Sequence, residues 1–120
     1  MSAESYPYVV NVDWLQVFCH DGNKGFLNYE YFEKSAYEFK LLPHGSRHFK
    51  EIWEVLDCDG DKYAVIQRVP HSRIISADGC IIQLCNRELY KSNFASEFLV
   101  FLASHKFKYK SISRLDICFD

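Results

Sequence analysis

Short runs of β-branched and aromatic residues, each ended by a turn-forming sequence, constrain the fold of this chain more than any other feature. Such runs predict β-strands, and a Gly-containing turn between two of them predicts a hairpin. The clearest pair covers residues 49–56 and 62–69, on either side of an Asp-Cys-Asp-Gly-Asp turn. Further strands are expected at residues 8–19, 37–42 and 111–120, and a second hairpin is expected to join 74–75 to 80–85.

The segment before the last run predicts a helix. Ser92 or Asn93 can cap its N-terminus, and it is expected to run to about Lys106. Its apolar residues lie three or four positions apart and so share one face: Phe94, Phe98, Phe101, Leu102 and His105. The order of elements predicts an α+β fold, a mostly antiparallel sheet of about five to six strands with one main helix packed on one face.

Length and composition fit a single domain covering residues 1–120. The chain is 48% hydrophobic and 25% charged, as in globular proteins, and is long enough for one core. Its net charge of −2 hides an asymmetry. Residues 1–61 hold 5 Lys/Arg against 11 Asp/Glu, a balance of −6, whereas residues 62–120 hold 9 against 5, a balance of +4. The second half can therefore present a basic surface to a nucleic acid.

The cysteines and the N-terminus indicate a cytoplasmic protein without a membrane partner. Five cysteines are an odd number without the spacing of a disulfide framework, so we expect reduced, mostly buried thiols. No apolar run reaches the length of a membrane span, and the first residues lack the basic and apolar regions of a signal peptide.

The expected strand at 111–120 carries the most informative charges. Alternation directs Leu115, Ile117 and Phe119 to one face, which we expect to be the core beneath the helix. Arg114, Asp116, Cys118 and Asp120 then share the other face. Burying an unpaired carboxylate costs several kcal/mol, so two acids on one face of a strand predict a hydrated, functional side of the sheet.

A third acid, Asp13, lies within the apolar run of the first expected strand. If the first and last strands pair at the centre of the sheet, Asp13 and Asp116 converge, and their hard oxygen ligands suit Mg²⁺ or Mn²⁺. Asp120 lies roughly 13 Å from Asp116 along a straight strand, too far to share one ion with it. We therefore expect Asp116 to be the main ligand, with Asp13 as its companion. The alternative is that Arg114 pairs with an acid at a strand edge.

Basic and aromatic residues alternate between the expected helix and the last strand. They are Lys106, Phe107, Lys108, Tyr109 and Lys110. Together with Arg114, the lysines and Tyr109 could hold single-stranded DNA by charge and stacking. The alternative is a solvated connector with one anchoring aromatic ring.

The two ends of the chain resemble a known family. The sequence VDWL at 12–15 and the sequence SRLDICFD at 113–120 are similar to motifs of replication initiation factors. These are the Rep proteins of rolling-circle plasmids and the related filamentous-phage initiators, in which an early acidic strand is followed much later by an R-x-D-x-x-x-D strand. The middle of the chain matches only in its many hairpins. Carried over by position, Asp13, Arg114, Asp116 and Asp120 correspond to the motif residues.

The resemblance implies a metal-assisted enzyme that nicks DNA at a replication origin, single-stranded or hairpin, through a tyrosine hydroxyl that becomes joined to the 5′ phosphate. That tyrosine lies downstream of the acidic strand in the family, and none of the eight tyrosines here occupies such a place. We therefore expect the N-terminal portion of a longer initiator, with no catalytic residue of its own and inactive alone. The alternatives are a non-catalytic DNA- or protein-binding α+β module, a homodimer among its forms, or a small enzyme that uses the Asp cluster alone.

Overall fold

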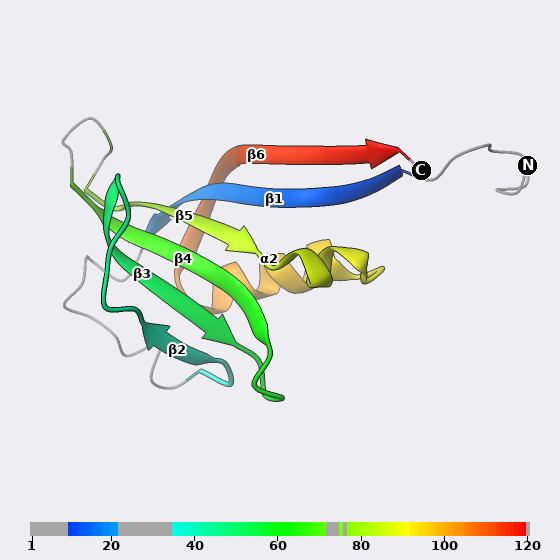
Figure 1. The fold of residues 1–120 in the computed structure, drawn as a ribbon, viewed down its shortest axis with the longest axis horizontal. Helices are drawn as coiled ribbons and strands as arrows, with labels where there is room; N and C mark the ends of the chain where they lie inside the picture. Colours follow the sequence, from blue (N-terminus) through cyan, green and yellow to red (C-terminus); the bar gives the residue numbers. More distant parts are fainter. Residues whose placement is uncertain (1–9, 22–34, 72–74, 76, 120) are drawn as a thin grey trace, which may run out of the picture.

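The computed structural model describes residues 10–21, 35–71, 75 and 77–119, with only the backbone described at 10–13, 118 and 119. Within these residues six antiparallel strands form one sheet in the order β2-β3-β4-β5-β1-β6 (Figure 1). The strands are β1 (Val10–Asp21), β2 (Glu38–Leu41), β3 (Phe49–Leu56), β4 (Lys62–Pro70), β5 (Gly79–Leu84) and β6 (Phe107–Phe119).

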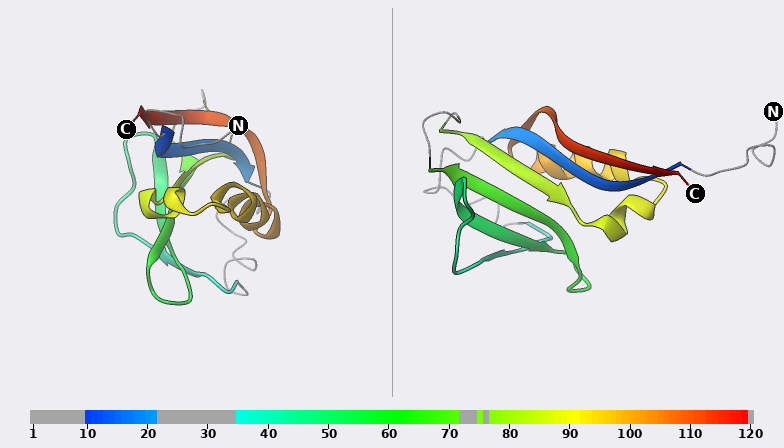
Figure 2. Two further views of the ribbon diagram at one scale, coloured as in Figure 1. Left: turned by 90° about the vertical axis from the view of Figure 1, so that its right-hand side faces the viewer. Right: turned by 45° about the horizontal axis from the view of Figure 1, so that its top comes forward.

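A short 3₁₀ helix, η3 (Asn86–Tyr90), and an α-helix, α2 (Phe94–Ser104), follow β5. Figure 2 shows α2 lying across one face of the sheet, beside the bent strand β6. The predicted α+β class, a mostly antiparallel sheet with one main helix on one face, is therefore confirmed. In the part of the chain described, no helix has the length and apolar character needed to cross a bilayer.

The strand register places apolar side chains in continuous rows on the helix side of the sheet. One row crosses all six strands, since each member is the direct partner of the next: Leu41, Trp53, Ile66, Ile82, Val17 and Ile112. The inner members of this row are buried, whereas the outer members Leu41 and Ile112 are half exposed. Directly paired residues face the same way, so the residues between them form the opposite, helix-free face.

Helix α2 is held by its apolar stripe. Phe98, Phe101 and Leu102 are each at most 3% exposed, and together their burial contributes roughly 5–9 kcal/mol. Its 11 residues are too few for an isolated helix to be stable in water. Packing against the sheet is therefore what maintains α2, as the predicted stripe required.

A buried ionic cluster joins three strands at one end of the helix-side face. Arg68 of β4 is fully buried, and its Nε and Nη2 both lie 2.7 Å from Asp21 Oδ2 of β1. Its Nη1 lies 3.2 Å from Glu51 Oε1 of β3, which also accepts a hydrogen bond from Trp53 Nε1 at 2.9 Å. Because β5 lies between β4 and β1, Arg68 links strands that are not neighbours.

His105, the residue after α2, is buried as a neutral side chain. Its Nδ1 donates to the Phe101 carbonyl at 2.7 Å, and its Nε2 accepts from the Ser35 hydroxyl at 2.6 Å. Ser35 Oγ in turn accepts from the Tyr37 backbone N–H at 2.9 Å. Burial lowers the pKa of His105, against the smaller opposing effect of the Phe101 carbonyl. His105 follows the C-terminal end of α2, where the helix dipole favours a cation, but burial has the larger effect.

Several predicted boundaries differ from the structure. Ile75 lies outside any strand, and β5 forms its hairpin with β4 instead, while Ile74 lies outside the described residues. Asn93 occupies the N-cap of α2, but its side chain makes no capping hydrogen bond. The segment expected to be a connector at 107–110 already belongs to β6.

Four cysteines have described side chains, and none of these four forms a disulfide. Cys19 and Cys80 are buried on paired strands, Cys85 is half-buried and Cys58 is exposed in the β3–β4 turn. The prediction of mostly buried thiols is therefore right for the two strand cysteines and wrong for Cys58, because a hairpin tip has no core beside it.

We expect Arg68→Ala to lower the free energy of unfolding by about 3–5 kcal/mol, because it leaves two carboxylates poorly solvated and without their buried cation. Urea denaturation monitored by circular dichroism measures the loss. The control Arg47→Ala removes an exposed arginine and should change stability by less than about 0.5 kcal/mol. Equal stability of the two variants would contradict the linking role of Arg68.

We expect His105 to make folding stability depend on pH. Its folded-state pKa lies below the ordinary 6.5, so its contribution is complete above about pH 6.5 and is lost as the pH falls through the folded-state pKa. Thermal melts between about pH 5 and pH 8, a range that brackets the ordinary histidine pKa of about 6.5, measure how the melting temperature changes with pH. The slope should diminish in His105→Gln and persist in His44→Gln, which alters an exposed histidine. An unchanged slope in His105→Gln would contradict the assignment.

Candidate nucleic-acid interface on the open face

The two strands that carry the motif-like sequences lie side by side. β1 and β6 are antiparallel partners along most of their lengths (Figure 1). Their expected position at the centre of the sheet is wrong, since β6 forms the edge and β1 lies next to it. The first residues of β1 pair only with β6 in the described sheet, so this end of the two strands forms a ribbon.

Arg114 and Asp116 share the open, helix-free face with β1 side chains. Arg114 is the direct partner of Gln16, and Asp116 is the partner of Trp14. The Arg114 guanidinium carbon lies 4.3 Å from the centroid of the Trp14 ring, a cation–π arrangement. The predicted shared face of Arg114 and Asp116 is thus present, and the structure adds Trp14 to it.

Asp116 is paired with Arg114. Arg114 Nη2 lies 2.8 Å from Asp116 Oδ2, and Nε lies 3.4 Å from Oδ1. Both side chains are about half exposed, at 52% and 46%. This is the arrangement that the sequence left as the alternative to a metal site, an arginine pairing with an acid at a strand edge.

Of the three acids predicted to form a metal site, Asp13, Asp116 and Asp120, only Asp116 has a side chain that the structure describes. Asp13 occupies an irregularity in the β1–β6 register, but its side chain and all of Asp120 lie outside the described residues. Among the residues whose side chains are described, no group of three His, Cys, Asp or Glu is placed to hold a metal ion. Asp116, already bound to Arg114, does not fit a metal site by itself.

The apolar side of β6 is not the buried surface that alternation predicts. Leu115 and Ile117 lie on the helix side but are 42% and 51% exposed. They lie where the β1–β6 ribbon extends toward its free end, and figure 2 shows that end projecting past the rest of the sheet. The side chains of Phe119 and Cys118, also assigned from alternation, lie outside the described residues.

The alternation of β6 separates the predicted DNA-binding residues Lys108 and Tyr109 onto different faces. Lys108 pairs with His20 on the open face, whereas Tyr109 pairs with the core residue Cys19 and lies on the helix side. Lys110 falls at the register shift between the pairs Tyr109–Cys19 and Ser111–Phe18 and is exposed. Lys108 and Tyr109 therefore do not share one face, because adjacent residues of a strand point to opposite sides, and contact of these residues with DNA stays a prediction.

Lys106 ends helix α2 in a left-handed backbone conformation. Its φ is +64°, a value that glycine adopts more readily than lysine, and its backbone N–H donates to the Ala103 carbonyl at 3.3 Å. Its side chain is exposed just before β6 begins. Lys106 therefore forms the corner between helix and strand, beside the face that Lys108 occupies.

Aromatic and polar side chains of β1 complete the open face. The alternation of β1 places Trp14, Gln16, Phe18 and His20 on this side, each half-buried. Phe18 and His20 meet edge to face, with ring centroids 5.9 Å apart. These contacts were recoverable from the period of two in residues 8–19, but the sequence does not reveal which face the helix covers.

The edge strand β6 and the residue before it carry an excess of positive charge. Residues 106–117 include four Lys/Arg and one Asp, a balance of +3. Exposed cations beside half-exposed indole and phenyl rings can contact phosphates and stack with bases. The arrangement therefore suits a flexible, single-stranded nucleic acid.

Comparison with known proteins adds no relative. The chain matches none of the family models, curated proteins or solved structures with which it was compared. What the interface can bind therefore follows from its own side chains.

Proposed function

We propose that this domain belongs to the N-terminal part of a rolling-circle DNA replication initiator and contacts origin DNA through the open face of β1 and β6. The observation that carries the proposal is the cluster of Trp14, Arg114 and Asp116, drawn from both motif-like strands and exposed on one face. A cytoplasmic location belongs to the same proposal, because the DNA substrate lies there.

The ion pair of Arg114 is suited to exchange with DNA. A half-exposed surface pair contributes about 0–1 kcal/mol, so replacing Asp116 by a phosphate costs little. Arg114 forms a planar fork of donors that matches phosphate oxygens. Once Arg114 moves to a phosphate, the Trp14 ring is uncovered for stacking with a base.

The same exchange would free Asp116 for a metal ion. Asp13 and Asp120 remain the proposed companions from the resemblance, and Mg²⁺ or Mn²⁺ is the cation that such carboxylates prefer. In the proposed enzyme the ion supplies charge stabilisation at the scissile phosphate. The nucleophilic tyrosine is proposed to lie beyond this chain, so residues 1–120 alone should not nick DNA.

A second candidate is a non-catalytic module that binds a protein, including another copy of this chain. A groove of about 310 Å³ between α2 and the helix side of β6 supports it. Its lining is almost entirely apolar and includes the half-exposed residues Leu99, Tyr109 and Ile112. Exposed apolar surface of this kind is typical of protein contacts rather than DNA contacts.

We expect the domain to bind a fluorescein-labelled single-stranded oligonucleotide with an affinity that falls as salt concentration rises. Lys108→Ala and Arg114→Ala should each weaken binding by about three- to tenfold and reduce the salt slope by about 0.7 per lost phosphate contact. Fluorescence anisotropy measures both quantities. Lys62→Ala is the matched control, since Lys62 is exposed in the β3–β4 hairpin and pairs with Glu54. Binding that is independent of salt would exclude phosphate contact at this face.

We expect Mn²⁺ to bind weakly in calorimetric titrations of the free domain and more tightly when the oligonucleotide is present, because DNA competes for Arg114. Asp116→Asn should abolish the binding, and Asp78→Asn, a change in an exposed acid paired with His20, should leave it intact. Equal Mn²⁺ binding by Asp116→Asn and the unmodified chain would contradict the proposal that Asp116 is a metal ligand. It would not bear on the proposed DNA contact.

A further inference from the structure

A cavity of about 310 Å³ lies between the β3–β4 turn, η3, the start of α2 and Tyr37. Acidic side chains dominate its charged lining. Its walls are formed by Ala36, Tyr37, Asp57, Cys58, Asp59, Tyr63, Glu88, Lys91 and Glu97. The volume is at the lower limit for sites that bind small organic molecules.

Two buried oxygen atoms on this wall lack hydrogen-bond partners. Glu88 and Tyr63 are each 2% exposed, and neither Glu88 Oε2 nor the Tyr63 hydroxyl forms a hydrogen bond in the part of the chain described. The Tyr37 ring lies against Tyr63 at 4.9 Å between centroids, and the Tyr37 hydroxyl adds to the effect of burial in raising the pKa of Tyr63, but it makes no well-formed hydrogen bond with Tyr63 Oη. Leaving such groups unpaired is costly, so each is a site where a ligand donor would be favourable.

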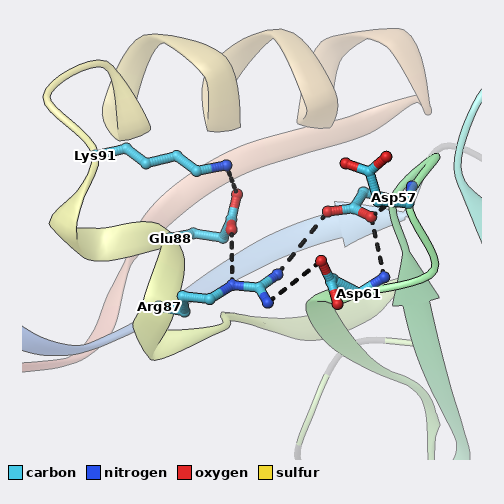
Figure 3. A network of polar contacts seen from close by, with 6 residues as sticks. Asp57, Asp61, Arg87, Glu88 and Lys91 are labelled. Atoms are coloured by element: carbon cyan, nitrogen blue, oxygen red, sulfur yellow. Dashed lines mark hydrogen bonds and ion pairs between the residues drawn. The ribbon is translucent and has the colours of Figure 1, made fainter.

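The ionic contacts of Glu88 leave this oxygen available. Lys91 Nζ lies 2.8 Å from Glu88 Oε1, on the other side of the carboxylate (Figure 3). Arg87 Nε is 3.7 Å from Oε2, which is an ion pair but too long for a hydrogen bond. Glu88 is thus held in place by two cations while Oε2 still lacks a donor.

The neighbouring turn is rigid and acidic. Asp57 Oδ1 accepts the backbone N–H groups of Asp59 and Asp61 at 2.9 and 3.0 Å, and Gly60 adopts a φ of +82°. Arg87 bridges this turn to η3 through contacts to Asp57 and Asp61 at 3.9 and 3.5 Å, as Figure 3 shows. The acidic turn predicted by the Asp-rich sequence is therefore one wall of a preformed cavity.

The cavity retains excess negative charge. Four carboxylates line it, and the cations beside them are Lys91 on the wall and Arg87 in the adjoining ion pairs. Among the described residues, neither Asp59 nor Glu97 forms an ion pair. Burial raises the pKa of Tyr37, and the carboxylates of Glu97 and Glu88 raise it further, which indicates that their negative potential reaches the rings.

A second hollow adjoins the first across Tyr37 and Glu97. It has a volume of about 400 Å³ and is lined by polar residues of α2 together with the apolar side chains of Val100 and Phe101. A ligand with a charged head in the first cavity can therefore extend an aliphatic or peptide body along α2.

We propose that this cavity binds an organic cation, the ammonium or guanidinium of a lysine- or arginine-type group. Its N–H groups donate to Glu88 Oε2 and the Tyr63 hydroxyl, the two buried oxygens that form no hydrogen bond. Its charge faces Glu97 and Asp59, and the tyrosine rings favour an organic cation through their π faces. The site lies on the helix side of the sheet and does not depend on DNA binding at the open face.

Titration of the whole chain with N-acetyl-lysine methylamide and N-acetyl-arginine methylamide, followed by NMR, tests the proposal. We expect at least one of them to bind with a Kd of about 1 mM, a value typical of so small a ligand. The isosteric neutral probe N-acetyl-norleucine methylamide should bind at least about tenfold more weakly, because it offers no N–H donor or charge at its tip. Equal binding of the neutral probe, or no binding of either cation, would overturn the site.

Three variants locate the binding. Glu88→Gln should weaken it by about tenfold, and Tyr63→Phe by about threefold or more, since each removes one acceptor or its charge. Tyr63→Phe should not lower the melting temperature, because the hydroxyl has no hydrogen bond to lose. Asp61→Asn is the matched control, an acid of the same turn that contacts Arg87 without lining the cavity. Equal weakening by Asp61→Asn and Glu88→Gln would show diffuse attraction and overturn the proposal.

The source of the cation is distinguished by two further probes, butylammonium and a pentapeptide with a central lysine flanked by glycines. Tighter binding of the peptide than of butylammonium supports a partner protein whose body occupies the second hollow. Equal binding of the two supports a free amine, with only the charged head recognised.

Discussion

The contact of Arg68 with Asp21 and Glu51 is the constraint on which the arrangement of this sheet depends. The guanidinium is fully buried, so its charge requires both acids, and each acid belongs to a different strand. The cluster fixes the end of β1 relative to β3 and β4, although β5 separates β4 from β1. β6 begins beside that fixed end, because Phe107 is the direct partner of Asp21.

The sheet is consequently held by tertiary contacts at one end and extends as a ribbon with few such contacts at the other. Near Asp21 the strands are joined by the ionic cluster, and α2 packs over their apolar rows. Toward Trp14 and Asp116 the chain continues as a ribbon of two strands with half-exposed apolar residues on its helix side. The candidate DNA-binding cluster thus lies on a part of the molecule that makes few tertiary contacts. Side chains there can exchange partners at a small cost in free energy.

Local patterns predicted the elements well. The hairpin of β3 and β4 follows from its Gly-containing turn, and the stripe of Phe98, Phe101 and Leu102 buries as its spacing requires. The order of strands was not accessible in this way, because the pairing of β1 with both β5 and β6 depends on contacts distant in sequence. The face of Ile112 was not accessible from alternation either, because an extra residue between Arg114 and Ile112 puts these two side chains on opposite faces.

The burial of the Glu88 carboxylate could not be predicted from the sequence. It lies in a short polar stretch without helical or strand periodicity, where an exposed loop is the ordinary expectation. Only the fold reveals that η3 directs it inward between Lys91 and Arg87. Burial is therefore the observation that distinguishes a structural or functional charge in an aperiodic segment from an ordinary surface charge.

The position of β1 between its two partners has a consequence for how the chain acquires its structure. Cys19 pairs with Cys80, and Val10 pairs with Phe119, so residues up to Phe119 must be present before β1 is hydrogen-bonded on both sides along its length. Pairing over such separations is slow, because the entropy of closing a long loop is lost before the contacts form. As the polypeptide leaves the ribosome, the hairpin of β3 and β4 can form early, whereas the β1 segment must wait, with its apolar residues exposed, until β6 emerges.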